Sequence, residues 1–221
     1  MKRLFSIITL LALILTSHAQ IQRLDTLSER VSSLIISTGE IKTGKNILDA
    51  NPTEIVDTLD DGYRITMLFD CVNIGRVRNQ NGKKKLGWRG FDQSYTGERP
   101  TLPQKVLTLD KPLGADVVVD VEKMDYVEYM IDMAAAEEVQ FPNEYKPLKP
   151  IGNYEGFYPD EPFNISTISY TPTTEKFKVR VIPVSYNQAT QIIRIPSKIV
   201  FSVKFTDVPT PSPEPADRRI R

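Results

Sequence analysis

The sequence predicts an all-β protein, an antiparallel β-sandwich with jelly-roll-like connections. From Tyr63 onward, β-branched and aromatic residues recur with a period of two, which is typical of strands that bury one face. Turn-forming residues separate these runs, so successive strands can pair as hairpins. The runs span residues 63–74, 105–109, 115–124, 163–170, 176–186, 190–195 and 198–205.

The chain begins with the features of a secretory signal peptide. Lys2 and Arg3 precede a largely apolar run at residues 4–15, and small residues follow it. Cleavage is therefore expected between Ala19 and Gln20, which would place the mature protein outside the cell or in the periplasm. No later stretch approaches the roughly 20 apolar residues of a spanning helix, so no membrane partner is expected after cleavage.

From Gln20 to about Ala50 the pattern is mixed. Helix-like spacing is found at Leu24, Leu27, Val31 and Leu34, but the same residues also fit strand and loop, and the sequence leaves both interpretations open. The first clear strand follows the turn signal Asp60-Asp61-Gly62.

Turn signals also separate the later strands, and one of these strands shows strict alternation. Phe177, Val179 and Val181 alternate with lysine and arginine, which indicates one buried face and one face in water. The alternating cations are Lys176, Lys178 and Arg180. The turn signals are Asn81-Gly82, Pro112-Leu113-Gly114, residues 172–174 and residues 187–190.

Two segments do not read as strands. Residues 134–162 form a long irregular stretch, and loops of that length in a compact domain are usually functional or disordered. Residues 209–215 hold four prolines, which predict a stiff, unpaired spacer before a basic end. The expected organisation is a signal peptide at 1–19, a β-sandwich domain at 20–206 and a Pro-rich tail at 207–221.

Composition argues against several classes of function. The chain has 28 basic and 28 acidic residues, so no global charge attracts nucleic acid. His18 is the single histidine and would leave with the signal peptide, and Cys71 is the single cysteine. Ser-His, Cys-His and His-ligated metal sites therefore cannot be assembled from the mature chain. We expect a non-catalytic protein without metal or cofactor.

Four local features were weighed as sites, and each has a plainer structural interpretation. Lysines 83–85 beside Trp88 and Arg89 could bind a polyanion, but an Asn-Gly turn followed by lysines favours a solvated hairpin tip. Asp57, Asp60 and Asp61 lack the spacing of a calcium loop. Cys71 reads as a buried, inert thiol, and residues 164–166 form a glycosylation sequon that matters only in a eukaryotic host.

Three motifs in order resemble the propeptide domain of gingipains, which are bacterial cysteine peptidases. Residues 97–103 have the form Gly-x-x-Pro-x-Leu-Pro and lead into two strands, the second rich in valine. An aromatic-proline stretch follows at 157–159, and the closing hairpin carries a Pro-x-x-Tyr-Asn motif at Pro183, Tyr186 and Asn187. The resemblance runs from Gly97 to Phe205, while residues 20–96 match only in their general β character.

This resemblance implies a function. In that family the domain precedes a secreted cysteine peptidase, assists its folding and keeps it latent by covering the active-site cleft. The inhibitory loop would include Gln140, Phe141, Pro142, Lys146 and Lys149. By eye, Gln140 or Phe141 stands where the family presents a basic residue, which departs from the family pattern. The resemblance further implies that the Pro-rich tail is a tether.

One other set of residues completes the predicted sites, and alternatives remain. The tail would be processed at Arg218, Arg219 or Arg221, and the partner would be the cognate gingipain-like peptidase. One alternative is an exported β-sandwich binding or adhesion module that uses Trp88 and its neighbouring lysines. Another is a stand-alone peptidase inhibitor.

Overall fold

The described part of the chain is a β-protein, as predicted from the sequence. The structure, a computed structural model, describes residues 21–77, 80–94, 100–134, 156–170 and 174–207. Thirteen strands and one short 3-10 turn at Gly44–Asn46 make up its regular structure. No helix in these ranges has the length and apolarity needed to cross a membrane.

The larger sheet is built around one long central strand. β13 (Ile192–Thr206) pairs along its whole length with β9 (Asp116–Met130). On its other side it pairs first with β12 (Ser185–Asn187) and then with β4 (Gly62–Leu68). β3 (Thr53–Leu59) completes the far edge by pairing with β4. All these pairs are antiparallel, with β9 at one edge of the sheet and with β3 and the short β12 at the opposite edge.

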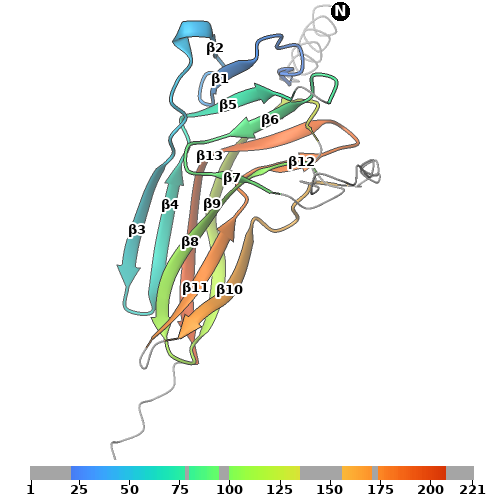
Figure 1. The fold of residues 1–221 in the computed structure, drawn as a ribbon. Helices are drawn as coiled ribbons and strands as arrows, with labels where there is room; N and C mark the ends of the chain where they lie inside the picture. The colour runs from blue at the N-terminus through green and yellow to red at the C-terminus, as the bar shows by residue number, and fades with distance from the viewer. Residues whose placement is uncertain (1–20, 78–79, 95–99, 135–155, 171–173, 208–221) are drawn as a thin grey trace, which may run out of the picture.

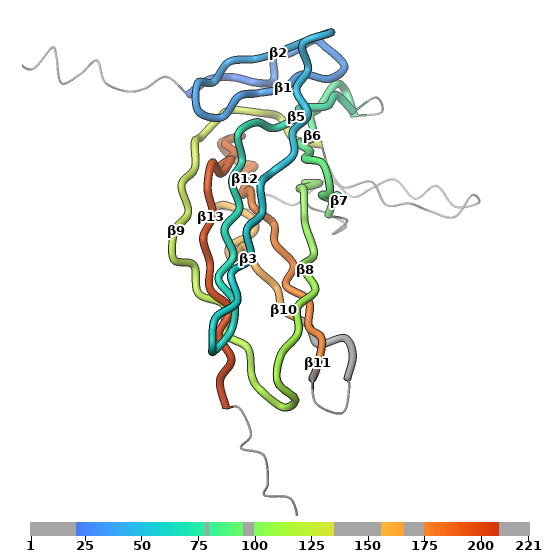
Figure 2. The backbone as a smooth tube through the Cα atoms, turned by 90° about the vertical axis from the view of Figure 1, so that its left-hand side faces the viewer, coloured from blue at the N-terminus to red at the C-terminus, as the bar shows by residue number. Residues whose placement is uncertain are grey.

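The second sheet packs face to face with the first to make the sandwich (Figure 1; Figure 2). Its order is β10 (Phe163–Tyr170), β11 (Thr174–Val181), β8 (Pro103–Pro112) and the short β7 (Asp92–Gln93). The chain crosses between the sheets from β8 to β9 and again from β11 to β12, which agrees with jelly-roll-like connections. The predicted alternation in β11 is confirmed, because its apolar residues are buried and its cations exposed.

A small sheet caps one end of the sandwich (Figure 1). It has the order β2 (Ile41–Thr43), β1 (Val31–Ile35), β5 (Cys71–Arg76) and β6 (Lys84–Gly87). β5 and β6 are joined through the predicted Asn81-Gly82 turn, where both residues have positive φ, as type I′ hairpin turns require.

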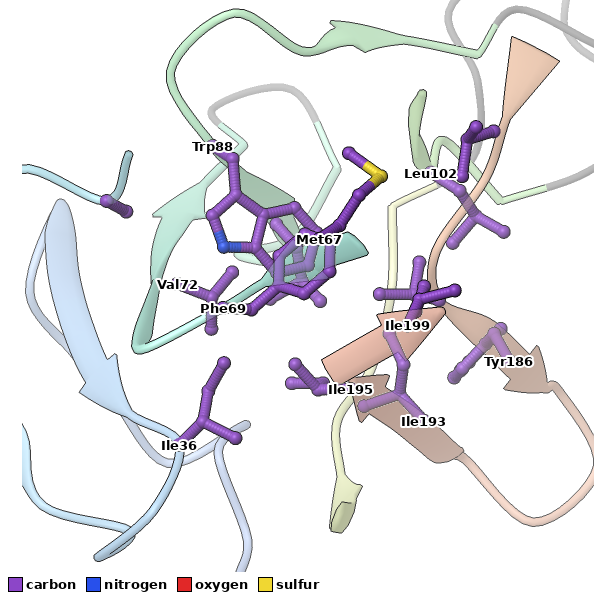
Figure 3. Close-up of a cluster of buried hydrophobic side chains, with 14 of the residues drawn as sticks. Ile36, Met67, Phe69, Val72, Trp88, Leu102, Tyr186, Ile193, Ile195 and Ile199 are labelled. Carbon is purple, nitrogen blue, oxygen red and sulfur yellow. The ribbon is translucent and has the colours of Figure 1, made fainter. Parts of the chain in front are cut away.

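One hydrophobic core runs through the small sheet and the sandwich. Figure 3 shows where they meet: Ile36 and Val72 from the capping end lie near Ile195 and Ile199 of β13. Phe69 lies between these groups, and its ring centroid is 4.9 Å from that of Trp88. Trp88 is almost fully buried and donates a hydrogen bond of 2.7 Å from Nε1 to the carbonyl of Cys71.

The structure divides the predicted runs differently from the sequence pattern. The run at 63–74 is two strands, β4 and β5, because the chain leaves one sheet for another at Phe69 and Asp70. The N–H of Phe69 bonds the carbonyl of Ser197, and the carbonyl of Asp70 accepts from Ile36, so this break is fixed by both sheets. The run at 176–186 is likewise split into β11 and β12.

Two predicted runs, at 190–195 and 198–205, are one strand. β13 passes through Pro196 with a register shift before Lys198, and a bulge is where a central strand tolerates proline. Near the N-terminus the helix reading is wrong for Val31–Ile35, which is strand β1, while Leu24 is buried in the core.

Candidate functional site

The predicted site residues lie outside the described residues. This applies to the inhibitory loop (Gln140, Phe141, Pro142, Lys146, Lys149), the processing site (Arg218, Arg219, Arg221) and the signal cleavage site (Ala19, Gln20). The structure does describe the two chain segments that flank residues 135–155, and these make up the candidate site.

The segment before residue 135 is fixed by backbone hydrogen bonds to three parts of the fold. The N–H of Ile131 bonds the carbonyl of Gln191 at 2.8 Å. The N–H of Ala134 bonds the carbonyl of Lys84 at 2.7 Å, and the carbonyl of Ala134 accepts from Thr101 at 3.0 Å. Ile131, Met133 and Ala134 are all buried, so the last described residues before position 135 are packed in the core.

The segment after residue 155 is paired with β12. Tyr158 and Tyr186 exchange two backbone hydrogen bonds, of 2.9 and 2.8 Å, in an isolated antiparallel bridge. This bridge extends the larger sheet by one residue at the edge of β12. Within the aromatic-proline stretch at 157–159, Tyr158 is thus joined to the sheet.

Tyr186 connects the two flanking segments. Its backbone pairs with Tyr158, and its phenol oxygen accepts a hydrogen bond from the backbone N–H of Met133. The side chain is 4% exposed, and burial raises the pKa of the Tyr186 phenol to about 12, although the bond from Met133 works in the opposite direction. Met133 and Tyr158, which lie on either side of residues 135–155 in the sequence, therefore both contact Tyr186.

Arg194 of β13 holds the returning segment from the sheet side. Its guanidinium lies 3.7 Å from the ring centroid of Phe157 and 4.9 Å from that of Tyr126. Its Nε donates to Glu128 of β9 at 2.9 Å. We call this arrangement of Tyr126, Arg194 and Phe157 the Arg194 stack. It borders a small pocket of about 150 Å³ that is also lined by Pro159.

A larger groove opens where the edge strands β9 and β10 face each other. Its volume is about 460 Å³. The lining residues come from β9, from the start of β10 and from the two residues before β10: Val119, Val121, Glu161, Pro162, Phe163, Asn164 and Ile165. Asn164 of the sequon is exposed there.

Other residues that the sequence offered as candidate sites are buried parts of the fold. Lys84 is buried, its Nζ donates to the carbonyl of Leu27, and burial lowers the pKa of its ammonium. Trp88 is also buried, so for Lys84 and Trp88 the favoured interpretation as a solvated hairpin tip is wrong, and these two residues are not available for a polyanion contact either. Cys71 is buried as predicted, and burial raises the pKa of its thiol. Among the described residues, no group of three or more metal-ligating side chains occurs.

Sequence reasoning found one of the key residues of this site and missed another. Tyr186 was noticed through the Pro-x-x-Tyr-Asn motif, but its link to Met133 joins distant parts of the chain and leaves no local pattern. Arg194 was passed over inside the run 190–195. Its one signal is a cation between Ile193 and Ile195, which are both fully buried.

The same fold occurs in solved structures of gingipain propeptide domains. One is a structure of gingipain K from Porphyromonas gingivalis that addresses its zymogenic latency. It has a TM-score of 0.59 and 16% identity and covers 72% of this chain and 96% of the other. Another is a complex of the pro- and mature domains of RgpB from Porphyromonas gingivalis, with a TM-score of 0.62 and 20% identity, and it covers 72% of this chain and 86% of the other.

No protein-family model matches the chain, and no curated protein sequence matches it. The resemblance inferred from three short motifs is thus confirmed at the level of the fold, which is that of a gingipain-type propeptide domain.

Proposed function

We propose that this chain is a secreted, non-catalytic propeptide domain that assists the folding of a gingipain-like cysteine peptidase and keeps it latent. The observation that supports this most strongly is the likeness of the fold to two gingipain propeptide structures, one of them a complex with the mature domain. In the RgpB complex the partner is the mature domain, and we propose a partner of the same kind here.

Residues 135–155 are the segment that we propose to occupy the active-site cleft. Support comes from its two flanks, which are held by Tyr186 and by the backbone bonds of Ala134. A segment whose ends are fixed loses less conformational entropy on binding than a free one. Phe141 or Gln140 would be presented to the specificity pocket, with Pro142 stiffening the segment.

Removal of the domain would follow cleavage in the tail. Arg218, Arg219 and Arg221 come after a proline-rich spacer that an endopeptidase can bind in extended form. The signal peptide would be cut between Ala19 and Gln20 during export.

Inhibition is the direct test of this proposal. The mature chain, residues 20–221, is titrated against mature RgpB, mature gingipain K and each gingipain-type peptidase of the source genome. We expect inhibition of at least one enzyme. Phe141→Ala should weaken it by about 1 to 3 kcal/mol, the range for losing a central anchor. Inhibition of none of these enzymes, together with no effect on their refolding, would reject the proposal.

The register of the inhibitory segment is tested by matched variants. If Gln140→Ala combined with Phe141→Ala inhibits as well as the parent while Lys146→Ala or Lys149→Ala does not, a lysine is the presented residue. The binding-module alternative loses its proposed contact because Trp88 is buried in the core. A stop codon directly after Arg221 would favour the stand-alone inhibitor over the precursor.

A further inference from the structure

Arg194 has surroundings that an ordinary surface arginine lacks. Its guanidinium lies over the rings of both Phe157 and Tyr126, with centroid distances of 3.7 and 4.9 Å, while Nε donates a hydrogen bond to Glu128. Stacked guanidinium groups interact with aromatic faces by about 0.5 to 2 kcal/mol, more when water is excluded. The planar group suits this role, and a lysine ammonium could not stack in the same way.

Each member of the stack comes from a different part of the chain. Tyr126 and Glu128 belong to β9, Arg194 belongs to the neighbouring strand β13, and Phe157 belongs to neither. Since β9 and β13 pair throughout their length, Tyr126, Glu128 and Arg194 have fixed positions relative to each other. Phe157 is the member whose position depends on the stack, because its own strand pairing is limited to the single bridge at Tyr158.

We propose that Arg194 is a positioning residue for inhibition: by holding Phe157 against the sheet, it fixes where the chain returns from residues 135–155. This inference rests on the proposed function and deepens it. Tyr186 ties the two ends of that segment to one place, and Arg194 sets the direction in which the chain enters Tyr158. Loss of the stack should leave the sandwich folded and the proposed contact with the peptidase weakened.

Arg64 provides a matched control. Arg64 lies on β4, which pairs with β13 in the same sheet. Like Arg194, it pairs with a glutamate of β9, because its Nη2 lies 2.7 Å from Oε2 of Glu122. No aromatic ring stacks on Arg64 among the described residues. Arg64→Ala therefore removes an arginine–glutamate pair without touching the returning segment.

The first experiment measures how readily the backbone bridge between Tyr158 and Tyr186 opens, and it needs no peptidase. Hydrogen exchange is followed at the backbone amides of Tyr158 and Tyr186 in the parent, Arg194→Ala, Arg194→Lys and Arg64→Ala, using the whole mature chain. We expect exchange to be about tenfold faster in Arg194→Ala, to be accelerated to a lesser degree in Arg194→Lys, and to be unchanged in Arg64→Ala. Exchange within twofold of the parent in Arg194→Ala, or equal acceleration in both alanine variants, would overturn the inference.

The second experiment measures inhibition of the peptidase that responds best to the parent chain in the titration described above. Arg194→Ala should raise the inhibition constant about tenfold, and Arg64→Ala should leave it within twofold. Unchanged inhibition by Arg194→Ala, in a variant whose exchange has increased, would overturn the positioning role. If the parent chain inhibits none of the enzymes, the proposed function is rejected, and the role of Arg194 in inhibition is rejected with it. The exchange data would still decide separately whether Arg194 holds Phe157 against the sheet.

Discussion

The two lateral sides of the sandwich are held together differently. On the side of β3 and β8, polar groups bridge the sheets: Lys105 pairs with Glu54, and the hydroxyl of Tyr63 donates to the carbonyl of Asp110 at 2.9 Å. On the side of β9 and β10, the sheets meet through apolar side chains, and the groove of about 460 Å³ opens between them. We call these the bridged side and the open side.

The difference shows how one sandwich can be closed on one side and accessible on the other. On the open side, Phe163 of β10 and Phe201 of β13 stack with ring centroids 4.4 Å apart. Phe201 is fully buried, whereas Val121 next to it in the sheet is 41% exposed. We therefore expect the attraction between the sheets there to depend on this aromatic pair, in which Phe201 is fully buried and Phe163 is half-buried.

The largest expected effect comes from removing that aromatic pair. Phe201→Ala should lower the free energy of unfolding by about 3 to 5 kcal/mol, because a fully buried ring is replaced by a cavity. Urea denaturation of the mature chain measures this loss. Phe201→Leu is the control and should cost much less, since it keeps most of the volume. A loss below about 1 kcal/mol for the alanine variant would show that the open side does not rely on this ring.

An intermediate effect on stability is expected from Tyr186 of β12, whose phenol is buried and hydrogen-bonded to Met133. The folded pKa of Tyr186 is about 12, compared with 10.0 for an unperturbed phenol. Because the folded value is the higher one, the unfolded chain releases this proton first as pH rises. The stabilisation of the folded state that comes from neutral Tyr186 is fully present below pH 10. It is lost between about pH 10 and 12, which lowers the free energy of unfolding by about 2 to 3 kcal/mol.

Tyr186→Phe is the control for this alkaline loss. The variant lacks the ionisable group, so its stability should fall less steeply than that of the parent between pH 10 and 12. It should be slightly less stable at neutral pH, since the N–H of Met133 loses its acceptor. Parallel pH dependence in the two proteins would show that Tyr186 is not buried as described.

The sequence predicted those elements whose pattern is local. β10 spans Phe163–Tyr170, as the run at 163–170 predicted, and the alternation in β11 is seen in its burial. β3 was missed because it is an edge strand with most of its residues exposed, so its sequence TEIVDTL shows no clean alternation. The break at Phe69 was missed because the apolar pattern resumes directly after it in β5 of the small capping sheet, whose residues Cys71, Val72 and Ile74 are also buried.

Contacts between distant segments were beyond the reach of a single sequence. The hydrogen bond between Met133 and Tyr186 and the cation–π contact between Arg194 and Phe157 depend on strand order and register, which local propensity does not determine. The motif at Pro183, Tyr186 and Asn187 did point to this hairpin, but only as a likeness to a family. The chemical role of Tyr186 follows from its burial and from its partner.

The smallest expected effect concerns the bridged side. Glu54 and Lys105 are about one quarter exposed, with side-chain exposures of 25% and 28%, so water screens much of their attraction. A double-mutant cycle with Glu54→Ala and Lys105→Ala should give a coupling energy of about 0.5 to 1 kcal/mol, which falls as salt is raised. Tyr63→Phe, which removes the other bridge, should cost a similar amount. A coupling energy as large as the loss in Phe201→Ala would reverse the comparison, because the polar bridge would then hold the sheets together as strongly as the aromatic pair does.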